Sequence, residues 1–331
     1  MKIVFMGTPD FSVPSIEILL NSKHKISAAV TTPDKQRGRG RKISYSPVKE
    51  FALKNNLPVL QPEKLKDENF INELKNINAD LFVVVAFRIL PKEVFTIPKF
   101  GSFNLHGSLL PKYRGAAPVQ WAIMKGETET GFTTFALAEK VDTGSVYLQE
   151  KINIDAEDDF GSLHDKMSIA GAKAVLDTVN LIESGNYNLL KQDDSLASPA
   201  PKITKETARI NWNNSAENIH NQIRGLSPFP GAYFLHNEKV IKIYKSKIFK
   251  TENLNPAEIK QTKKELYIGT GNGTLEILEL QREGSRRMTT SPGSAPPARI
   301  STRTRPTPWT RTGSRVTAAS VLTGGGRSEM T

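Results

Sequence analysis

The sequence predicts an α/β fold, with a mostly parallel sheet covered by helices, followed by a smaller β-rich domain. Three observations support this prediction. Residues 2–30 alternate strand, helix and strand as a βαβ unit does, residues 79–87 (ADLFVVVAF) form the near-continuous apolar run of a strand buried on both faces, and short β-like segments follow residue 231. The chain has 331 residues, enough for two domains of ordinary size.

The composition is that of a globular protein and excludes several kinds of site. Apolar residues make up 38% and charged residues 24% of the chain, and no apolar run approaches the roughly 20 residues of a membrane-spanning helix. There is no cysteine, which excludes disulfides, thiolate metal ligands and a cysteine nucleophile. The chain starts directly with a strand-like segment and lacks the layout of a signal peptide, so we expect a cytoplasmic protein.

Positive charge is spread unevenly along the chain. The net charge is +11, and all 29 lysines lie before residue 265. Residues 291–331 contain six arginines and one acid, Glu329, so they carry +5 and leave +6 for residues 1–290. A surplus of positive charge of this size on residues 1–290, whose sequence has the pattern of a folded chain, indicates a polyanionic partner.

Residues 291–331 differ in composition from everything before them. Ser, Thr, Pro, Gly, Ala and Arg dominate, and no apolar periodicity remains. Such a segment cannot bury a core, so we predict that it is disordered. The abrupt change also raises the hypothesis of an out-of-frame ending, which an intact reading frame between the codons for Arg286 and Ser291 would refute.

The elements of the first domain are separated by clear turn signals. Ser46 and Pro47 place a cap and a first-turn proline at the start of a helix, and a long amphipathic pattern ends near Ser184. The expected order is strand 2–7, helix from 12, strand 26–30, helix from 46, strand 58–60, helix 68–77, strand 79–87, strand 100–106, helix from 118, strand 131–137, strand 146–154 and a helix within 155–184.

An irregular segment precedes the second domain. Residues 187–205 contain several serines and prolines without periodicity, so we interpret them as an interdomain linker. A helix around 216–224 and four short strands, near 232–235, 240–244, 265–269 and 274–280, predict a mainly β domain that forms a barrel. The predicted division is a first domain 1–186, a linker 187–205, a second domain 206–290 and the tail 291–331.

A cationic loop is expected between the second strand and the next helix. Residues 31–47 include Arg37, Arg39, Arg41 and Lys42 among glycine and proline, with no apolar periodicity. Taken alone, such a run is more readily explained by a solvated surface insertion. The functional interpretation is a flexible arm that follows a phosphate backbone, with an affinity that falls as salt rises.

Three polar residues stand at the ends of neighbouring predicted elements. Asn104 and His106 are two apart on a strand and face the same side, and Asp142 lies in a Val-Asp-Thr-Gly turn. The carboxyl ends of strands in an open α/β sheet are where active sites usually form. An amide and an imidazole can hold the oxyanion of acyl transfer to an amine, and a carboxylate can fix the imidazole and manage the amine proton.

Each of these residues also has a plain structural explanation. Asn104 and His106 could be a buried pair that satisfies its own hydrogen bonds, and Asp142 could simply form a turn. Arg114 is equally consistent with a surface charge and with a functional role. A metal site is a poor alternative, since the five histidines show no recognisable ligand spacing.

The sequence around these residues resembles a known family. The stretch FNLHGSLLPKYRGAAPVQWAI (103–123), followed by VDTG (141–144), is similar to formyltransferases that use 10-formyltetrahydrofolate. The opening KIVFMGTPDFSVPSIEIL, the GRGRK loop and NQIRGLSPFPGAY (221–233) resemble the branch of this family that formylates methionyl initiator tRNA. The resemblance covers about residues 1–290 and implies a Rossmann-like catalytic domain followed by an OB-like domain.

The resemblance also implies roles for individual residues. Asn104, His106 and Asp142 would form the catalytic trio, the cationic loop would meet the acceptor end of tRNA, and the β domain would grip the tRNA backbone. The chain departs from many relatives at Phe87-Arg88, where it is one residue shorter. The other residues assigned by resemblance are, for the folate, Phe87, Arg88, Ile89, Leu90, Ser108, Leu109, Leu110, Pro111 and Val141 and, for tRNA, Arg37, Arg39, Arg41 and Lys42.

The resemblance therefore implies an enzyme of translation initiation that transfers a formyl group from 10-formyltetrahydrofolate to the amino group of methionyl initiator tRNA, as a monomer and without a metal. Two rivals stay open at this point. A formyltransferase acting on a small amine would share the trio but have little use for the loop or the β domain. A non-catalytic RNA-binding protein would explain the charge but not the trio.

Overall fold

The computed structural model of the protein describes residues 1–37, 42–249, 254–262 and 265–290. Arg39 and Arg41 of the cationic loop lie outside the described residues, as do the side chains of Arg37 and Lys42. The tail 291–331, for which the sequence predicts disorder, also lies outside them.

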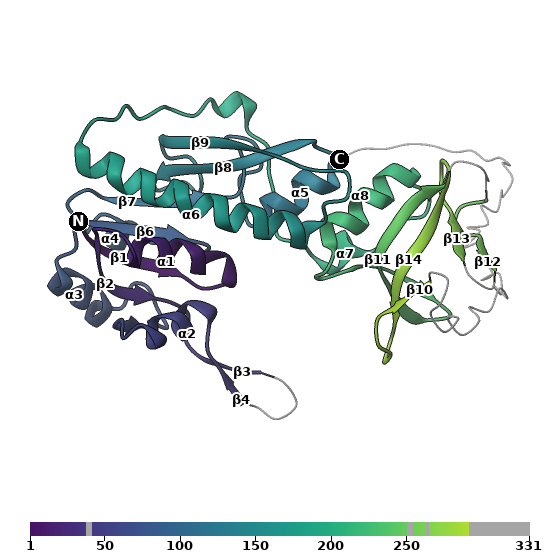
Figure 1. The fold of residues 1–331 in the computed structure, drawn as a ribbon, viewed down its shortest axis with the longest axis horizontal. Coiled ribbons are helices and arrows are strands. Elements are labelled where there is room, and N and C mark those ends of the chain that lie inside the picture. The colour runs from purple at the N-terminus through teal and green to yellow at the C-terminus, as the bar shows by residue number, and fades with distance from the viewer. Residues whose placement is uncertain (38–41, 250–253, 263–264, 291–331) are drawn as a thin grey trace, which may run out of the picture. The chain divides into compact units, whose positions relative to one another are not determined.

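A seven-stranded sheet organises the first part of the chain (Figure 1). Its strands are β1 Lys2–Gly7, β2 Lys25–Val30, β5 Val59–Leu60, β6 Leu81–Val85, β7 Ser102–His106, β8 Glu129–Ala136 and β9 Val146–Asn153. The spatial order is β5-β2-β1-β6-β7-β8-β9, in which all neighbouring strands are parallel except the pairs β7–β8 and β8–β9, which are antiparallel. The predicted mostly parallel sheet is therefore confirmed.

Helices cover both faces of this sheet. They are α1 Val13–Leu20, α2 Pro47–Lys54, α3 Glu68–Ile77, α4 Lys92–Phe95, α5 Pro118–Met124 and α6 Phe160–Ser184, with a short 3₁₀ turn η1 Asp10–Ser12 before α1. Ile3 and Phe5 of β1 pack with α1, α2 and α6, whereas Val4 and Met6 pack with α3 and α4. Because successive strand side chains point to opposite faces, a continuous apolar run such as Leu81–Val85 fills both layers.

Removing a large side chain from the middle of this sheet should destabilise the protein strongly. Phe82 is fully buried between β6 and the helices α3 and α4, so Phe82→Ala should lower the free energy of unfolding by about 3–5 kcal/mol. Urea unfolding followed by circular dichroism measures this change. Leu53→Ala on α2 removes a half-exposed side chain and should cost less than about 1 kcal/mol; equal losses in the two variants would contradict the burial.

The cationic loop is partly a hairpin, which the sequence analysis did not expect. Strands β3 Lys35–Arg37 and β4 Lys42–Ser44 pair antiparallel, with Arg37 opposite Lys42. The prediction of an irregular loop over all of residues 31–47 was wrong, because short polar strands carry no apolar alternation. The pairing brings the two ends of the basic segment together.

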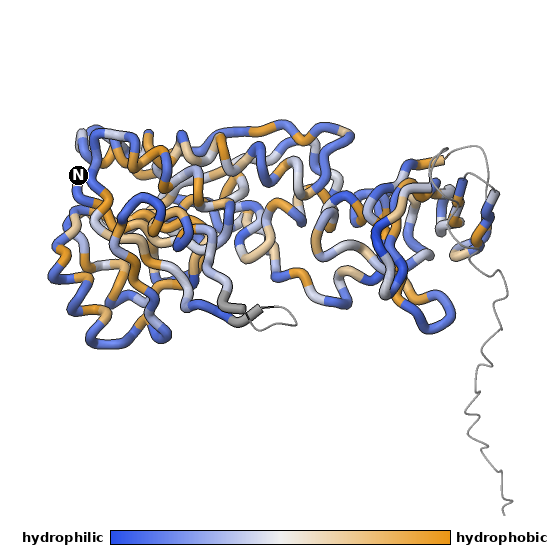
Figure 2. The backbone as a smooth tube through the Cα atoms, turned by 60° about the horizontal axis from the view of Figure 1, so that its bottom comes forward, coloured by the Kyte–Doolittle hydropathy of each residue, from blue (hydrophilic) through white to orange (hydrophobic). Residues whose placement is uncertain are grey.

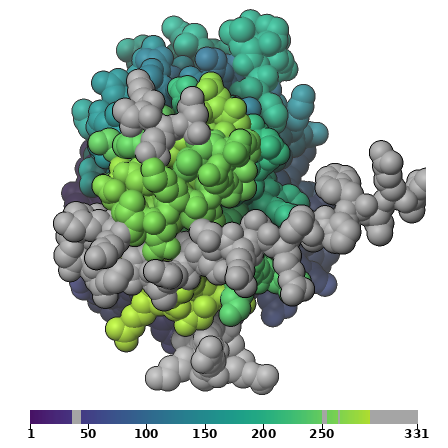
Figure 3. All heavy atoms as spheres, turned by 90° about the vertical axis from the view of Figure 1, so that its right-hand side faces the viewer, coloured from purple at the N-terminus to yellow at the C-terminus, as the bar shows by residue number. Residues whose placement is uncertain are grey.

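A second, antiparallel sheet follows in the chain. Its strands are β10 Ala232–His236, β11 Lys239–Phe249, β12 Ile259–Gln261, β13 Leu266–Gly269, β14 Thr274–Arg282 and β15 Met288–Thr289, preceded by α7 Lys205–Ala208 and α8 Ala216–Leu226. The order is β10-β11-β14-β13-β12, with β15 on β14. Hydrophobic and hydrophilic residues alternate along the long strands (Figure 2), and the surface residues of this part appear in green to yellow in Figure 3. This separate, curled sheet confirms the predicted OB-like β domain.

Among the residues that the structure describes, no helix has both the length and the apolar character that crossing a membrane requires.

Candidate active site

The main cavity of the first domain lies where three parallel strands end. The chain builds outward from β1 to β2 and β5 on one side and continues with β6 and β7 on the other, so the strand order reverses between β1 and β6. A crevice at such a switch point is the usual ligand site of an open α/β sheet. The cavity has a volume of about 880 Å³, and its lining includes Pro9, Asp10 and Phe11 after β1, Ala86, Phe87 and Ile89 after β6, and Asn104 to Gly107 at the end of β7.

The structure brings Asn104, His106 and Asp142 together in this cavity. His106 is 6% exposed, and its Nδ1 lies 3.8 Å from Oδ2 of Asp142. The Asn104 side chain is half-buried, and within the described parts of the chain no hydrogen bond to its amide is found. A buried, self-satisfied Asn/His pair therefore does not describe the site, since the amide is left available to a ligand.

The hydrogen bond of His106 settles which ring nitrogen faces the carboxylate. Nε2 lies 2.9 Å from the backbone oxygen of Tyr113, and because a carbonyl only accepts, Nε2 carries the hydrogen. Nδ1 is left on the side of Asp142. Tyr113 has a left-handed backbone (φ 60°), its hydroxyl donates to Glu127 at 2.6 Å, and burial together with this bond raises the pKa of the hydroxyl.

Asp142 has a side chain that is 10% exposed and a left-handed backbone (φ 56°). Its Oδ2 accepts a hydrogen bond from the backbone N–H of Gly115 at 2.9 Å. The carboxylate is thus turned inward, toward His106 and the loop that follows β7. A side chain that only formed the Val-Asp-Thr-Gly turn would bond locally to its own backbone, so the turn explanation is insufficient.

Arg114, which the sequence left undecided, is not a free surface charge. Its side chain is 14% exposed, and Nη2 donates to Oε1 of Gln192 and to Oδ1 of Asp194, both at 2.7 Å. The bond from Arg114 holds the pKa of Asp194 below its ordinary value. The sequence analysis missed Gln192 altogether, because an isolated polar residue in an irregular segment carries no local signal.

A smaller cavity of about 100 Å³ adjoins the main one, and Phe87, Ile89, Asn104, Val141 and Asp142 line both. Arg88 and Leu90 also line the smaller cavity. Five of the residues that the resemblance assigned to the folate therefore lie around one hollow, namely all of them except Ser108 to Pro111.

Arg88 is held at this hollow by the chain that follows β5. Its two Nη groups donate to the backbone oxygens of Pro62 at 2.7 Å and Glu63 at 3.0 Å, and burial lowers the pKa of the guanidinium. Its Nε is buried and has no hydrogen-bond partner.

Ser108 to Pro111, the other residues assigned to the folate, line neither of these two cavities. Ser108 is fully buried, and its hydroxyl donates to the backbone oxygen of Lys112 at 2.6 Å. Leu110 packs in a cluster with Phe135 and Val146. The turn is an internal support for the loop that carries Tyr113 and Gly115.

The sequence analysis also missed an aromatic cluster that lines the main cavity. The ring of His164, on α6, lies 5.1 Å from Phe11 and 5.5 Å from Phe160, and all three residues line the cavity together with Pro228. Phe11 follows the turn after β1, so the rule that sites form at strand ends could have pointed to it. Nothing local in the sequence links it to residues 150 positions later.

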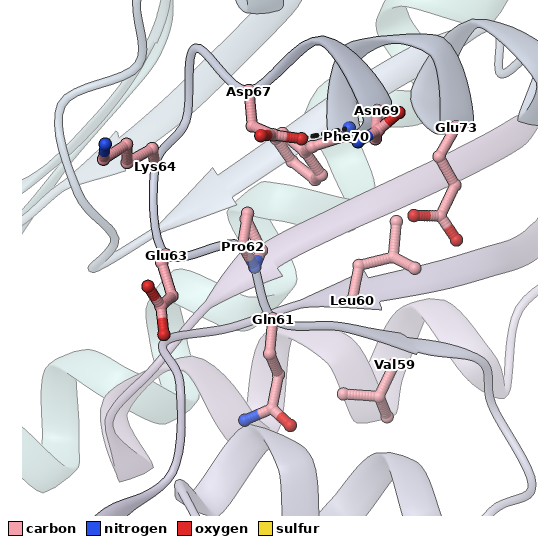
Figure 4. A pocket seen from close by; sticks show the side chains of 10 residues that line it. All are labelled: Val59, Leu60, Gln61, Pro62, Glu63, Lys64, Asp67, Asn69, Phe70 and Glu73. Atoms are coloured by element: carbon pink, nitrogen blue, oxygen red, sulfur yellow. Dashed lines mark hydrogen bonds between the residues drawn. The ribbon is translucent and has the colours of Figure 1, made fainter.

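A third hollow, of about 610 Å³, lies past the end of the edge strand β5 (Figure 4). Asp67 caps the N-terminus of α3, and Figure 4 shows its side chain accepting a hydrogen bond from the backbone N–H of Phe70. The carboxylates of Glu63 and Glu73 lie apart from Asp67 in this view. It contains none of the predicted catalytic residues, so the cavity at β1, β6 and β7 is the candidate site. In the described part of the chain, no cluster of three His, Asp or Glu side chains could hold a metal ion.

The comparisons with known proteins agree with this architecture. A family model described as formyl transferase matches residues 1–179, and one described as formyl transferase, C-terminal domain, matches residues 202–292. The chain is 47% identical to methionyl-tRNA formyltransferase of Caldanaerobacter subterraneus subsp. tengcongensis, over 87% of this chain and 94% of that protein. It is 45% identical to methionyl-tRNA formyltransferase of Flavobacterium johnsoniae, over 87% and 93%.

Solved structures of low sequence identity share the fold. Methionyl-tRNA formyltransferase from Clostridium thermocellum is similar with a TM-score of 0.53 and 17% identity, over 76% of this chain and 95% of that chain. HypX from Aquifex aeolicus, in complex with tetrahydrofolic acid, is similar with a TM-score of 0.62 and 18% identity, over 88% of this chain and 46% of that chain, so this chain spans about half of it. Both family models match, and the first covers more than half of this chain. The chain therefore belongs to the formyl transferase family.

Proposed function

We propose that this protein transfers the formyl group of 10-formyltetrahydrofolate to the α-amino group of methionyl initiator tRNA, for translation initiation in the cytoplasm. The observation that carries the proposal is the convergence of Asn104, His106 and Asp142 in the switch-point cavity. The chain holding them is 47% identical to a methionyl-tRNA formyltransferase along nearly the whole of that relative.

The two adjoining cavities fit the formyl donor. Asn104 lines both of them, and within the described residues its amide has no hydrogen bond. A flat ring system with donors and acceptors on its edges would bind to such an amide. We assign the pterin to the hollow formed by Phe87, Arg88, Ile89, Leu90 and Val141. To the turn from Ser108 to Pro111 we assign the role of shaping the path by which the folate enters.

The residues of the site divide the proton and charge changes of the transfer. The donor supplies an electrophilic formyl carbon: the amine nitrogen bonds to it, its bond to N10 of the folate breaks, and the proton lost by the amine is balanced by one gained at N10. The Asn104 amide donates to the formyl oxygen, where negative charge develops. Nδ1 of His106 can donate there only when both ring nitrogens carry hydrogen, since Nε2–H is bonded to Tyr113. Asp142, 3.8 Å from Nδ1, takes part in removing the amine proton.

We further propose that the parts of the chain divide the work. Residues 1–186 would carry the chemistry, 206–290 would grip the tRNA backbone, and 187–205 would join them, in a protein that acts as a monomer. Arg37, Arg39, Arg41 and Lys42, at and between the strands β3 and β4, would follow the phosphates of the acceptor end.

Formyl transfer from 10-formyltetrahydrofolate to purified methionyl initiator tRNA tests the proposal directly. We expect turnover at low salt and a loss of about 10³–10⁵ in apparent affinity for tRNA between 50 and 200 mM salt, if six to ten phosphates are contacted. The measurement is initial rate against tRNA concentration at several salt concentrations.

Two results would point elsewhere. Tetrahydrofolate binding without transfer to tRNA would favour a small-amine acceptor. Salt-dependent RNA binding without folate binding would favour a non-catalytic RNA-binding protein.

A further inference from the structure

We infer that Gln192 is a positioning residue for Asp142, so that the segment predicted to be only a linker is part of the support of the active site. The inference rests on the proposed role of Asp142 in formyl transfer. It starts from one buried amide: Gln192 is 8% exposed and lies about 50 residues from both of the backbone carbonyls to which it donates.

The side chain of Gln192 uses its whole hydrogen-bonding capacity at this point. Nε2 donates to the backbone oxygens of Asp142 at 3.0 Å and Gly144 at 2.8 Å. Oε1 accepts from Nε of Arg114 at 3.2 Å and from its Nη2 at 2.7 Å. Among side chains, only a carboxamide offers two N–H donors on one atom and a carbonyl acceptor beside it. The four hydrogen bonds of Gln192 therefore require this kind of side chain.

These bonds act on both sides of the Asp142 carboxylate. The backbone of Asp142 is left-handed, a conformation that is uncommon for residues other than glycine although aspartate adopts it more readily than most. Its Oδ2 is oriented by the N–H of Gly115, the residue next to Arg114. Gln192 therefore holds the backbone of Asp142, which carries the carboxylate. Through its bond to Arg114 it also holds the residue next to Gly115, whose N–H orients that carboxylate.

The segment around Gln192 also supports the partner of His106. Ser198 Oγ accepts from the N–H of Tyr113 at 2.9 Å, and the backbones of Arg114 and Ala200 bond at 2.7 Å. Tyr113 is the residue whose carbonyl holds Nε2 of His106 at 2.9 Å. At Gly115 (φ 130°) a Cβ would approach the oxygen of Ala200 to 2.5 Å, so this close approach excludes other residues.

The test uses two substitutions and one matched control. Gln192→Met keeps the length of the side chain without its hydrogen bonds, and Gln192→Glu keeps the acceptor for Arg114 but loses both donors. Lys191→Met places the same side chain at the exposed neighbouring position. We expect both Gln192 variants to lower kcat by about 10- to 100-fold with KM for both substrates within twofold, and Lys191→Met to match the wild type.

A double-mutant cycle separates positioning from general destabilisation. If Gln192 acts through the Asp142 carboxylate, Gln192→Met should lower kcat less than twofold in an Asp142→Asn background, while the shifts in Tm add. The same fold-loss in both backgrounds, or an unchanged kcat in the single variants, would overturn the inference. Hydrogen exchange over residues 140–145 should be faster in Gln192→Met than in Lys191→Met whatever the acceptor is, and equal exchange would also overturn it. An inactive wild-type protein would refute the proposed function alone.

Discussion

Asn104→Leu should lower kcat for formyl transfer by about 10²–10³-fold, the cost of removing one oxyanion donor from a closed site. Leucine resembles asparagine in shape and has no side-chain N–H to offer. The amide of Asn104 faces the cavity, where no other described side chain competes for it. Steady-state kinetics with saturating tRNA and folate measure the change, and a thermal melt checks that the variant is folded.

A matched substitution at another cavity tests whether replacing any cavity-lining asparagine by leucine lowers turnover. Asn69→Leu makes the same replacement at the hollow beyond β5, which contains none of the predicted catalytic residues (Figure 4). It should retain full turnover. If Asn104→Leu also kept nearly wild-type turnover, Asn104 would have no part in stabilising the formyl oxygen, and the assignment of the trio would fail.

Replacing Arg37, Arg39, Arg41 and Lys42 by alanine should lower kcat/KM for methionyl-tRNA by about 10- to 100-fold near 100 mM salt. Each phosphate that the protein no longer neutralises reduces the slope of log K against log salt by about 0.7 to 0.9, so four such phosphates reduce it by about 3. The chemistry itself should be unaffected, and kcat at saturating tRNA should stay close to the wild-type value. Rates measured across a salt series give both numbers.

A control variant shows whether the loss of kcat/KM and the smaller salt slope come from the lower net charge alone. Alanine at Lys54, Lys75, Lys99 and Lys173 removes the same charge from exposed positions elsewhere in the first part of the chain. These replacements should leave the salt slope nearly unchanged. Equal reductions of kcat/KM in the two variants would mean that the hairpin formed by β3 and β4 has no special role in binding tRNA.

The sheet and the shared position of the two candidate residues on β7 could be predicted because their signals are local. An apolar run such as Leu81–Val85 has to be buried on both faces, whatever the rest of the chain does. Asn104 and His106 are two positions apart, so any strand places them on one face. The hairpin β3 and β4 escaped prediction since its pairing depends on backbone hydrogen bonds between polar residues rather than on an apolar pattern.

Local patterns along the chain were enough to predict the α/β order, the β-rich second domain and the amide, imidazole and carboxylate that are candidates for catalysis. The contacts that hold these three groups appear only in the folded structure. In that structure Nε2 of His106 is hydrogen-bonded to the carbonyl of Tyr113, Arg114 is bonded to Gln192, and the predicted linker lies against the loops of the candidate site. The bonds of Gln192 join residues that are 48 to 78 positions apart in the chain. Periodicity and spacing describe only near neighbours along the chain, so no local pattern could have contained them.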